Sequence, residues 1–251
     1  NQQDIESIAG ELTAVLPKNH TVSEFARSKA WLPQPGETLV LQKDIDVADV
    51  AVVDMTVHPI PGYKQKAQAA VLRDHFRTIA FDKMRTEEQL AYAVGAIASS
   101  IEDYSAVGLF IQTPVKGPKE VQARFDQFKK EYAVELDNMT EDTFLQLKNA
   151  TLVSLKEQPK NLNDEMGPLI NDWYRENFSF DSKQKLINEV EKVTLADIKQ
   201  YYKQTMLNPQ AARLNVQLRG TKFIESDFAD LPNQTKITTL DAYYNGIKLQ
   251  K

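Results

Sequence analysis

The spacing of apolar side chains along this 251-residue chain predicts an order of helices and strands. Ile5, Ile8, Leu12 and Val15 fall on one helical face, whereas residues 49–58 carry the branched and apolar side chains typical of a strand. The helical pattern predicts helices at 4–16, 63–84, 118–137, 141–156, 162–177, 183–192 and 195–207. The alternating pattern predicts strands at 38–45, 49–58, 90–100, 105–113 and 211–219.

The order of these elements indicates the fold class. A first helix is followed by strand–strand–helix–strand–strand, then by several helices and a last strand. Strands follow one another without a helical crossover in two places. This order favours an α+β fold with a largely antiparallel sheet and helices packed on one face over a doubly wound parallel sheet.

Breaks in the pattern suggest where the chain divides. Residues 20–37 contain Pro33, Pro35 and Gly36 and are expected to be a connection, which makes them the best candidate for a domain boundary. Residues 221–251 lack clear periodicity, so we expect them to form a C-terminal tail on the surface.

Composition and charge exclude several classes of function. A formal net charge of −5 gives no reason to expect nucleic acid, and no run of about 20 apolar residues predicts membrane insertion. With no cysteine, disulfides, thiolate metal sites and cysteine nucleophiles are absent. The chain opens with neither a signal-peptide pattern nor an initiator Met, so we expect a fragment or a processed product.

The three histidines do not form a short-spaced metal motif. His20, His58 and His75 are scattered along the chain. A zinc helix around His75 would need a second histidine and an acid one turn away, where Thr78 and Ile79 stand. We therefore expect His75 to be structural or exposed. The sequence also lacks a glycine-rich phosphate loop and a G-x-S-x-G elbow.

The segment 83–94, KMRTEEQLAYAV, carries the most suggestive chemistry, in Arg85 and Tyr92. Strand alternation would place Tyr92 on the same face as Leu90 and Val94, with small side chains on the other face that let a helix or a bound peptide approach. A phenol can donate a hydrogen bond to a developing oxyanion, and a guanidinium can hold a carbonyl or carboxylate. The plainer interpretation, a solvated helix end before an ordinary strand, stays open and is the one that composition alone favours.

Residues 84–92, MRTEEQLAY, resemble the R-T-x-E-Q-L-G-Y signature of the C-terminal half of the pitrilysin/insulinase family of zinc metallopeptidases. Ala91 stands where relatives often have glycine, a small departure. Weaker similarities extend the resemblance over about residues 1–220, and they lie in YAVELDNMTEDTF at 132–144, LKEQPK at 155–160, the segment from Trp173 to Phe178, and VTLADIKQYYKQTML at 193–207.

The resemblance implies a two-half clamshell around a peptide chamber, in which each half holds two related α+β domains. It implies that residues 37–220 are the non-catalytic last domain and that residues 1–36 are the terminal helix of the preceding domain plus a connection. The zinc motif, an inverted H-x-x-E-H, belongs to a helix of the first domain. The helix at 63–84 would correspond to that zinc helix but lack the metal ligands. Zinc is then the cofactor of the full-length enzyme. This chain alone is expected to bind no metal or other cofactor and to have no peptidase activity.

The resemblance also implies roles for Arg85 and Tyr92. Tyr92 would bind the scissile carbonyl as it becomes an oxyanion, and Arg85 would orient Tyr92 or the substrate backbone. The partners would be the N-terminal catalytic half of the same polypeptide and a peptide substrate. Two alternatives remain, a catalytically inactive relative that acts as a peptide-binding or scaffolding subunit, and an unrelated α+β domain with a coincidental motif. For a bacterial member, the resemblance implies a periplasmic or secreted location.

Overall fold

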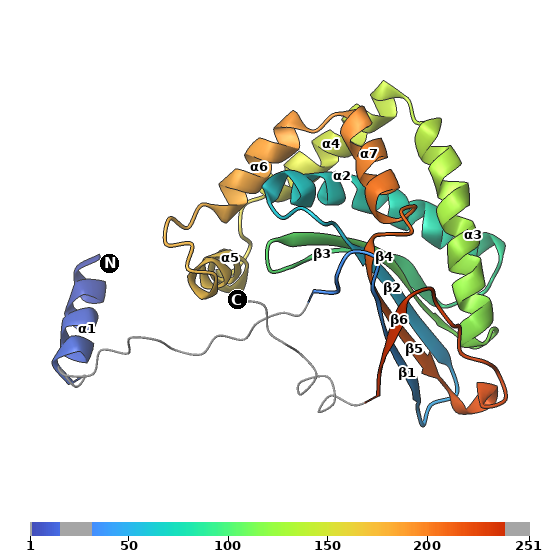
Figure 1. Cartoon of the computed structure of the whole chain (residues 1–251). Coiled ribbons are helices and arrows are strands. Elements are labelled where there is room, and N and C mark those ends of the chain that lie inside the picture. The colour runs from blue at the N-terminus through green and yellow to red at the C-terminus, as the bar shows by residue number, and fades with distance from the viewer. Residues whose placement is uncertain (1, 16–31, 239–251) are drawn as a thin grey trace. The chain divides into compact units, whose positions relative to one another are not determined.

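The computed structural model describes residues 2–15 and 32–238 (Figure 1). The chain divides into two compact units, residues 1–30 and 31–251. In the first unit, α1 (Gln2–Val15) confirms the helix predicted at 4–16, and its apolar side chains are exposed. Most of the predicted connection, including His20, and the last part of the predicted tail lie outside the described residues.

The second unit holds the remaining elements. Its helices are α2 (Tyr63–Phe81), α3 (Pro118–Asp137), α4 (Glu141–Lys156), α5 (Leu162–Tyr174), α6 (Ser182–Lys192) and α7 (Leu195–Thr205). Its strands are β1 (Thr38–Asp44), β2 (Val50–Val57), β3 (Ala93–Ile101), β4 (Tyr104–Thr113), β5 (Ala212–Arg219) and β6 (Gln234–Ile237). A π-helical turn, η1 (Asp82–Glu87), follows α2, and a short 3-10 helix, η2 (Thr221–Phe223), follows β5.

The strands form one six-stranded sheet in the order β3-β4-β2-β5-β1-β6. Three pairs are antiparallel, β3 with β4, β4 with β2, and β2 with β5, whereas β1 runs parallel to both β5 and β6. Helices α2, α3, α4, α6 and α7 lie on one side of this sheet (Figure 1). The predicted class, α+β with a largely antiparallel sheet and helices on one face, is confirmed.

Aromatic side chains fill the core between the helices and the sheet. Phe76, Phe128, Tyr132 and Tyr202 are at most 1% exposed, and the ring centroids of Phe76 and Tyr132 lie 4.6 Å apart. The buried phenols have partners, because the Tyr132 hydroxyl lies 2.8 Å from His75 Nδ1 and the Tyr202 hydroxyl donates to a backbone carbonyl. His75 is therefore a structural residue, as expected.

A buried carboxylate ties α3 to the sheet. Asp54 of β2 is 1% exposed and accepts hydrogen bonds from Lys129 of α3 and Arg213 of β5. Burial alone would raise the pKa of Asp54, but the positive charges of Lys129 and Arg213 outweigh burial and hold it far below its ordinary value. The carboxylate therefore stays ionised and anchors the helix over the strands.

The opposite face of the sheet carries apolar side chains that are only partly covered. Val53, Met55 and Val216 are half-buried there, and Phe110 is exposed. Gly108 brings β4 close to β2 in this region, because a Cβ on it would lie 2.3 Å from the Asp54 carbonyl oxygen.

Four elements differ from the sequence expectation by three residues or more. Helix α5 ends at Tyr174 instead of residue 177. Helix α2 ends at Phe81 instead of residue 84, because the chain widens into the π turn. Strand β3 begins at Ala93 instead of residue 90. The sequence did not predict β6, which lies within the expected tail and pairs with β1. Four residues without apolar alternation carry no strand signal, and here the pairing with β1 supplies the order.

Candidate functional site

The segment that carries Arg85 and Tyr92 leaves α2 through an unusual turn. The amide of Glu88 donates to the carbonyl of Lys83 at 3.0 Å, one residue wider than α-helical spacing. Gln89 then adopts a left-handed conformation with φ of 51°, and the Leu90 amide bonds to the Met84 carbonyl at 2.9 Å. A non-glycine residue in this region is uncommon and needs support from the surrounding structure.

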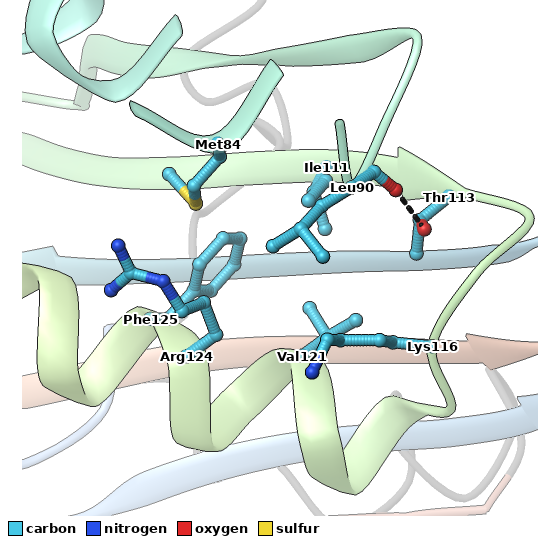
Figure 2. A pocket seen from close by; sticks show the side chains of 8 residues that line it. All are labelled: Met84, Leu90, Ile111, Thr113, Lys116, Val121, Arg124 and Phe125. Carbon is cyan, nitrogen blue, oxygen red and sulfur yellow. Dashed lines mark hydrogen bonds between the residues drawn. The ribbon is translucent and has the colours of Figure 1, made fainter. Parts of the chain in front are cut away.

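Apolar packing supplies part of that support. Met84 and Leu90 are 0% and 7% exposed, and Figure 2 shows both side chains pointing toward Val121 and Phe125 of α3. The crevice between them has no space wide enough for a water molecule. At the far end the Thr113 hydroxyl donates to the Leu90 carbonyl, drawn as a dashed line in Figure 2. The crevice is therefore a packed seam and not a ligand site.

An ion pair supplies the rest. Arg124 of α3 donates two hydrogen bonds to the Glu88 carboxylate, from Nε to Oε2 at 2.8 Å and from Nη2 to Oε1 at 2.6 Å. Its Nη2 also donates to Glu131 at 3.0 Å. The Arg124 side chain is 11% exposed and that of Glu88 27%. The hydrogen bond to Glu88 raises the pKa of Arg124, so the guanidinium stays charged. Planar two-point pairing of this kind fixes orientation as well as distance.

Arg85 lies on the outside of the π turn. Its side chain is exposed, and its guanidinium carbon lies 4.8 Å from the centre of the Phe81 ring. Within the described part of the chain, Arg85 forms no ion pair with any carboxylate. A guanidinium with a free hydrogen-bonding edge can bind a carbonyl or carboxylate group from another molecule or another part of a longer chain.

Tyr92 lies just before β3 and is 47% exposed. Its hydroxyl donates to the carboxylate of Asp49, the residue before β2, and accepts a hydrogen bond from Gln112 of β4. The hydrogen bond to Asp49 raises the pKa of Tyr92, because it stabilises the protonated phenol. The phenol therefore stays a hydrogen-bond donor at neutral pH.

The structure groups the candidate residues differently from the sequence expectation. No hydrogen bond or ring contact joins Arg85 to Tyr92 in the described residues. Tyr92 does not share a face with Leu90 and Val94, which are buried, because the left-handed turn at Gln89 delays regular alternation until Ala93. The sequence did not predict that Asp49 and Gln112 are the hydrogen-bond partners of Tyr92. The only available signal was strand pairing, which sets Ala93 opposite Gln112.

The described residues offer no donor set for a metal ion. They contain no group of three or more histidine, cysteine, aspartate or glutamate side chains arranged to hold one. His58 is buried, and its Nε2 lies 3.2 Å from the Gln204 side-chain oxygen. His75 Nδ1 is hydrogen-bonded to the Tyr132 hydroxyl. The zinc that the resemblance implies for a full-length enzyme therefore does not fit the residues described in this chain.

Comparisons with known proteins agree with the resemblance. Residues 71–170 match the family model described as "PQQ synthase PqqF-like, C-terminal lobe domain 4". "Protease 3" of Salmonella typhimurium is 26% identical over 202 residues, which cover 80% of this chain and 21% of that protein. The chain thus spans about a fifth of the length of the curated relatives it matches.

Solved structures share the fold. The crystal structure of pitrilysin superposes with a TM-score of 0.81 at 23% identity, covering 89% of this chain and 24% of that one. A "peptidase M16 inactive domain" from Pseudomonas fluorescens superposes with a TM-score of 0.59 at 14% identity, covering 92% of this chain and 53% of that one. Together with the sequence matches, these findings confirm the resemblance to the C-terminal domain of the pitrilysin/insulinase family.

Proposed function

We propose that this chain is the zinc-free C-terminal domain of a longer zinc metalloendopeptidase that encloses and degrades peptides. The sequence similarity to Protease 3 and to a C-terminal lobe domain supports this proposal. The other half of the same polypeptide supplies the zinc and the glutamate that activates its water. This chain contributes a wall of the peptide chamber. For a bacterial parent protein, we propose a periplasmic or secreted location.

Arg85 and Tyr92 are the residues through which the domain assists the reaction. This assignment is supported by the way in which the segment is held. The segment contains a π turn and a left-handed Gln89. The Glu88–Arg124 ion pair and the hydrogen bond from Thr113 hold it in this conformation. A strained turn held by several independent contacts presents its side chains at fixed positions. Tyr92 binds the developing oxyanion, and Arg85 binds the substrate backbone.

Turnover of the full-length protein tests this assignment. Tyr92→Phe removes one oxyanion donor, and losing such a donor typically costs about 10²- to 10³-fold in kcat. We expect that loss with little change in KM, and unchanged zinc content. Tyr174→Phe, at a 77% exposed tyrosine on α5, serves as the control and should leave kcat unchanged. A Tyr92→Phe enzyme with normal kcat contradicts the assignment.

A second candidate is a catalytically inactive peptide-binding or scaffolding subunit. One observation favours it: the only hydroxyl proton of Tyr92 is already donated to Asp49. A chamber wall needs no free donor at that place. The two candidates differ in turnover, since a parent protein that binds peptides and never cleaves them fits only the second.

A further inference from the structure

The Tyr92 hydroxyl has no hydrogen-bonding proton to spare. A phenol carries one O–H donor, and here that donor points to Asp49 Oδ2. The Gln112 side-chain nitrogen donates to the Tyr92 oxygen and lies 3.3 Å from the same Asp49 oxygen. Tyr92 can therefore donate to a peptide carbonyl only after its hydroxyl group has turned away from Asp49.

No cation contacts the Asp49 carboxylate among the residues that the structure describes. In the described residues it forms no ion pair, and both of its side-chain hydrogen bonds end on Oδ2, which leaves Oδ1 for a further partner. Two other acids nearby in the sequence, Asp44 and Asp54, do have cationic partners. Asp44 binds Arg219 at 2.6 Å, and Asp54 binds Arg213 and Lys129. Asp49 thus presents an uncompensated negative charge beside Tyr92.

The backbone fixes the place of this charge. Gly220 lies so close to the turn between β1 and β2 that a Cβ on it would lie 2.2 Å from the Asp49 carbonyl oxygen. The amide of Thr221 also donates to the Val47 carbonyl at 2.8 Å. The turn is therefore held against the end of β5, and Asp49 is presented from a fixed backbone.

We propose that Asp49 is a specificity-determining residue that selects peptides with a lysine or arginine side chain beside Tyr92. An ammonium or guanidinium group makes a stronger, charge-assisted hydrogen bond to a carboxylate than a neutral phenol does. Such a group carries several N–H donors, so it binds the unoccupied Oδ1 and also competes for Oδ2, where it displaces the Tyr92 hydroxyl. The freed hydroxyl then donates to the peptide carbonyl. A neutral side chain leaves the Asp49–Tyr92 contact intact, and an acidic one is repelled. The inference rests on the proposed peptide-binding function.

Peptide affinity of the 251-residue chain tests the inference. The probes are copies of one neutral host peptide in which lysine, norleucine or glutamate is placed at each position in turn. We expect one register where lysine binds at least about tenfold tighter than norleucine, the scale of one charge-assisted hydrogen bond. In Asp49→Asn that preference should disappear. Asp44→Asn, which changes a paired acid nearby, should keep it.

The NMR signal of the Tyr92 ring gives a second test that does not require a variant at Asp49. In chain labelled at the tyrosine ring carbons, with Tyr92→Phe to assign the signal, the lysine peptide should shift the Tyr92 signal and the norleucine peptide should not. Peptides that bind with no lysine preference, or a preference that survives in Asp49→Asn, overturn the inference while leaving the proposed function intact. Failure of every peptide to bind counts against both.

Discussion

At the scale of single residues, Arg124 decides where the segment 84–92 lies. The ion pair between Arg124 and Glu88 is only partly exposed to solvent. Removing the guanidinium therefore leaves the Glu88 carboxylate without its charged partner. We predict that Arg124→Gln lowers the free energy of unfolding by about 1–3 kcal/mol. Amide hydrogen exchange at residues 88–92 should become faster by a larger factor than in the rest of the sheet.

Lys119→Gln is the matched control for this prediction. It breaks an ion pair on the same helix, with Asp227, in which both side chains are more than 60% exposed. Exposed pairs of this kind contribute about 0–1 kcal/mol, so the control should stay close to the original stability. Equal effects of the two variants, or unchanged exchange at residues 88–92 in Arg124→Gln, contradict the anchoring role.

Asp54 gives the stability a definite dependence on pH. Its pKa in the folded chain lies below the value of about 3.9 expected when unfolded, so the unfolded chain binds the proton more readily. The stabilisation is therefore complete above about pH 5 and is lost as the pH falls. Asp54→Asn removes this dependence and leaves Lys129 and Arg213 with only the partly exposed carboxylate of Asp126 as a charged partner.

We predict that Asp54→Asn is less stable than the original chain at pH 7 by about 3–5 kcal/mol, the usual cost of breaking a buried pair. The difference should shrink between pH 5 and pH 2, because the original chain loses stability faster. Urea unfolding at several pH values measures both. Parallel curves for the two proteins would show that Asp54 does not carry the acid sensitivity.

Residue chemistry was only partly readable from the sequence. The signature around Arg85 and Tyr92 singles them out, because the signature is local. Asp49 and Gln112 have no local signal, since they lie 43 and 20 residues from Tyr92 along the chain and meet it only through strand pairing. Glu88 looks like an ordinary surface acid until α3 brings Arg124 against it.

At the scale of elements, apolar periodicity predicts the helices and most strands but not their irregular ends. The pattern of α2 continues to Met84, which is buried, so periodicity alone cannot distinguish an α-helix from the π turn that keeps Met84 facing the core. The strand pattern likewise begins at Leu90, although regular pairing starts at Ala93. Tertiary contacts with α3 and Thr113 decide both boundaries.

Gly108 on β4 and Gly95 on the edge strand β3 are predicted to tolerate an added methyl group differently. A Cβ on Gly108 would lie 2.3 Å from the Asp54 carbonyl oxygen and 2.7 Å from the Met55 Cα, so the backbone itself must move. A Cβ on Gly95 would lie 2.8 Å from the Phe110 ring, which is 36% exposed and can turn away.

We therefore predict that Gly108→Ala lowers the free energy of unfolding by about 1–3 kcal/mol or more, the range for an overpacked site. Gly95→Ala should cost less, because a side chain yields where backbone does not. Thermal or urea unfolding of the two variants side by side gives the comparison. A Gly95→Ala variant that is the less stable of the two would contradict the tight approach of β4 to β2.

At the scale of the whole molecule, the chain is one side of a proposed chamber and holds no metal site in its described residues. No helix among those residues is long and apolar enough to cross a membrane. In the proposed function, Arg85 and Tyr92 complete an active site whose zinc belongs to the other half of a longer polypeptide.

This proposal can be tested by hydrolysis of a quenched fluorescent peptide by the parent protein's N-terminal half, with and without this chain. We predict that adding the chain raises turnover and that Tyr92→Phe abolishes the gain, whereas Tyr174→Phe preserves it. If the chain binds the peptide or the other half and turnover does not rise, the segment 84–92 is only a wall of the chamber, and the scaffolding function replaces the catalytic one.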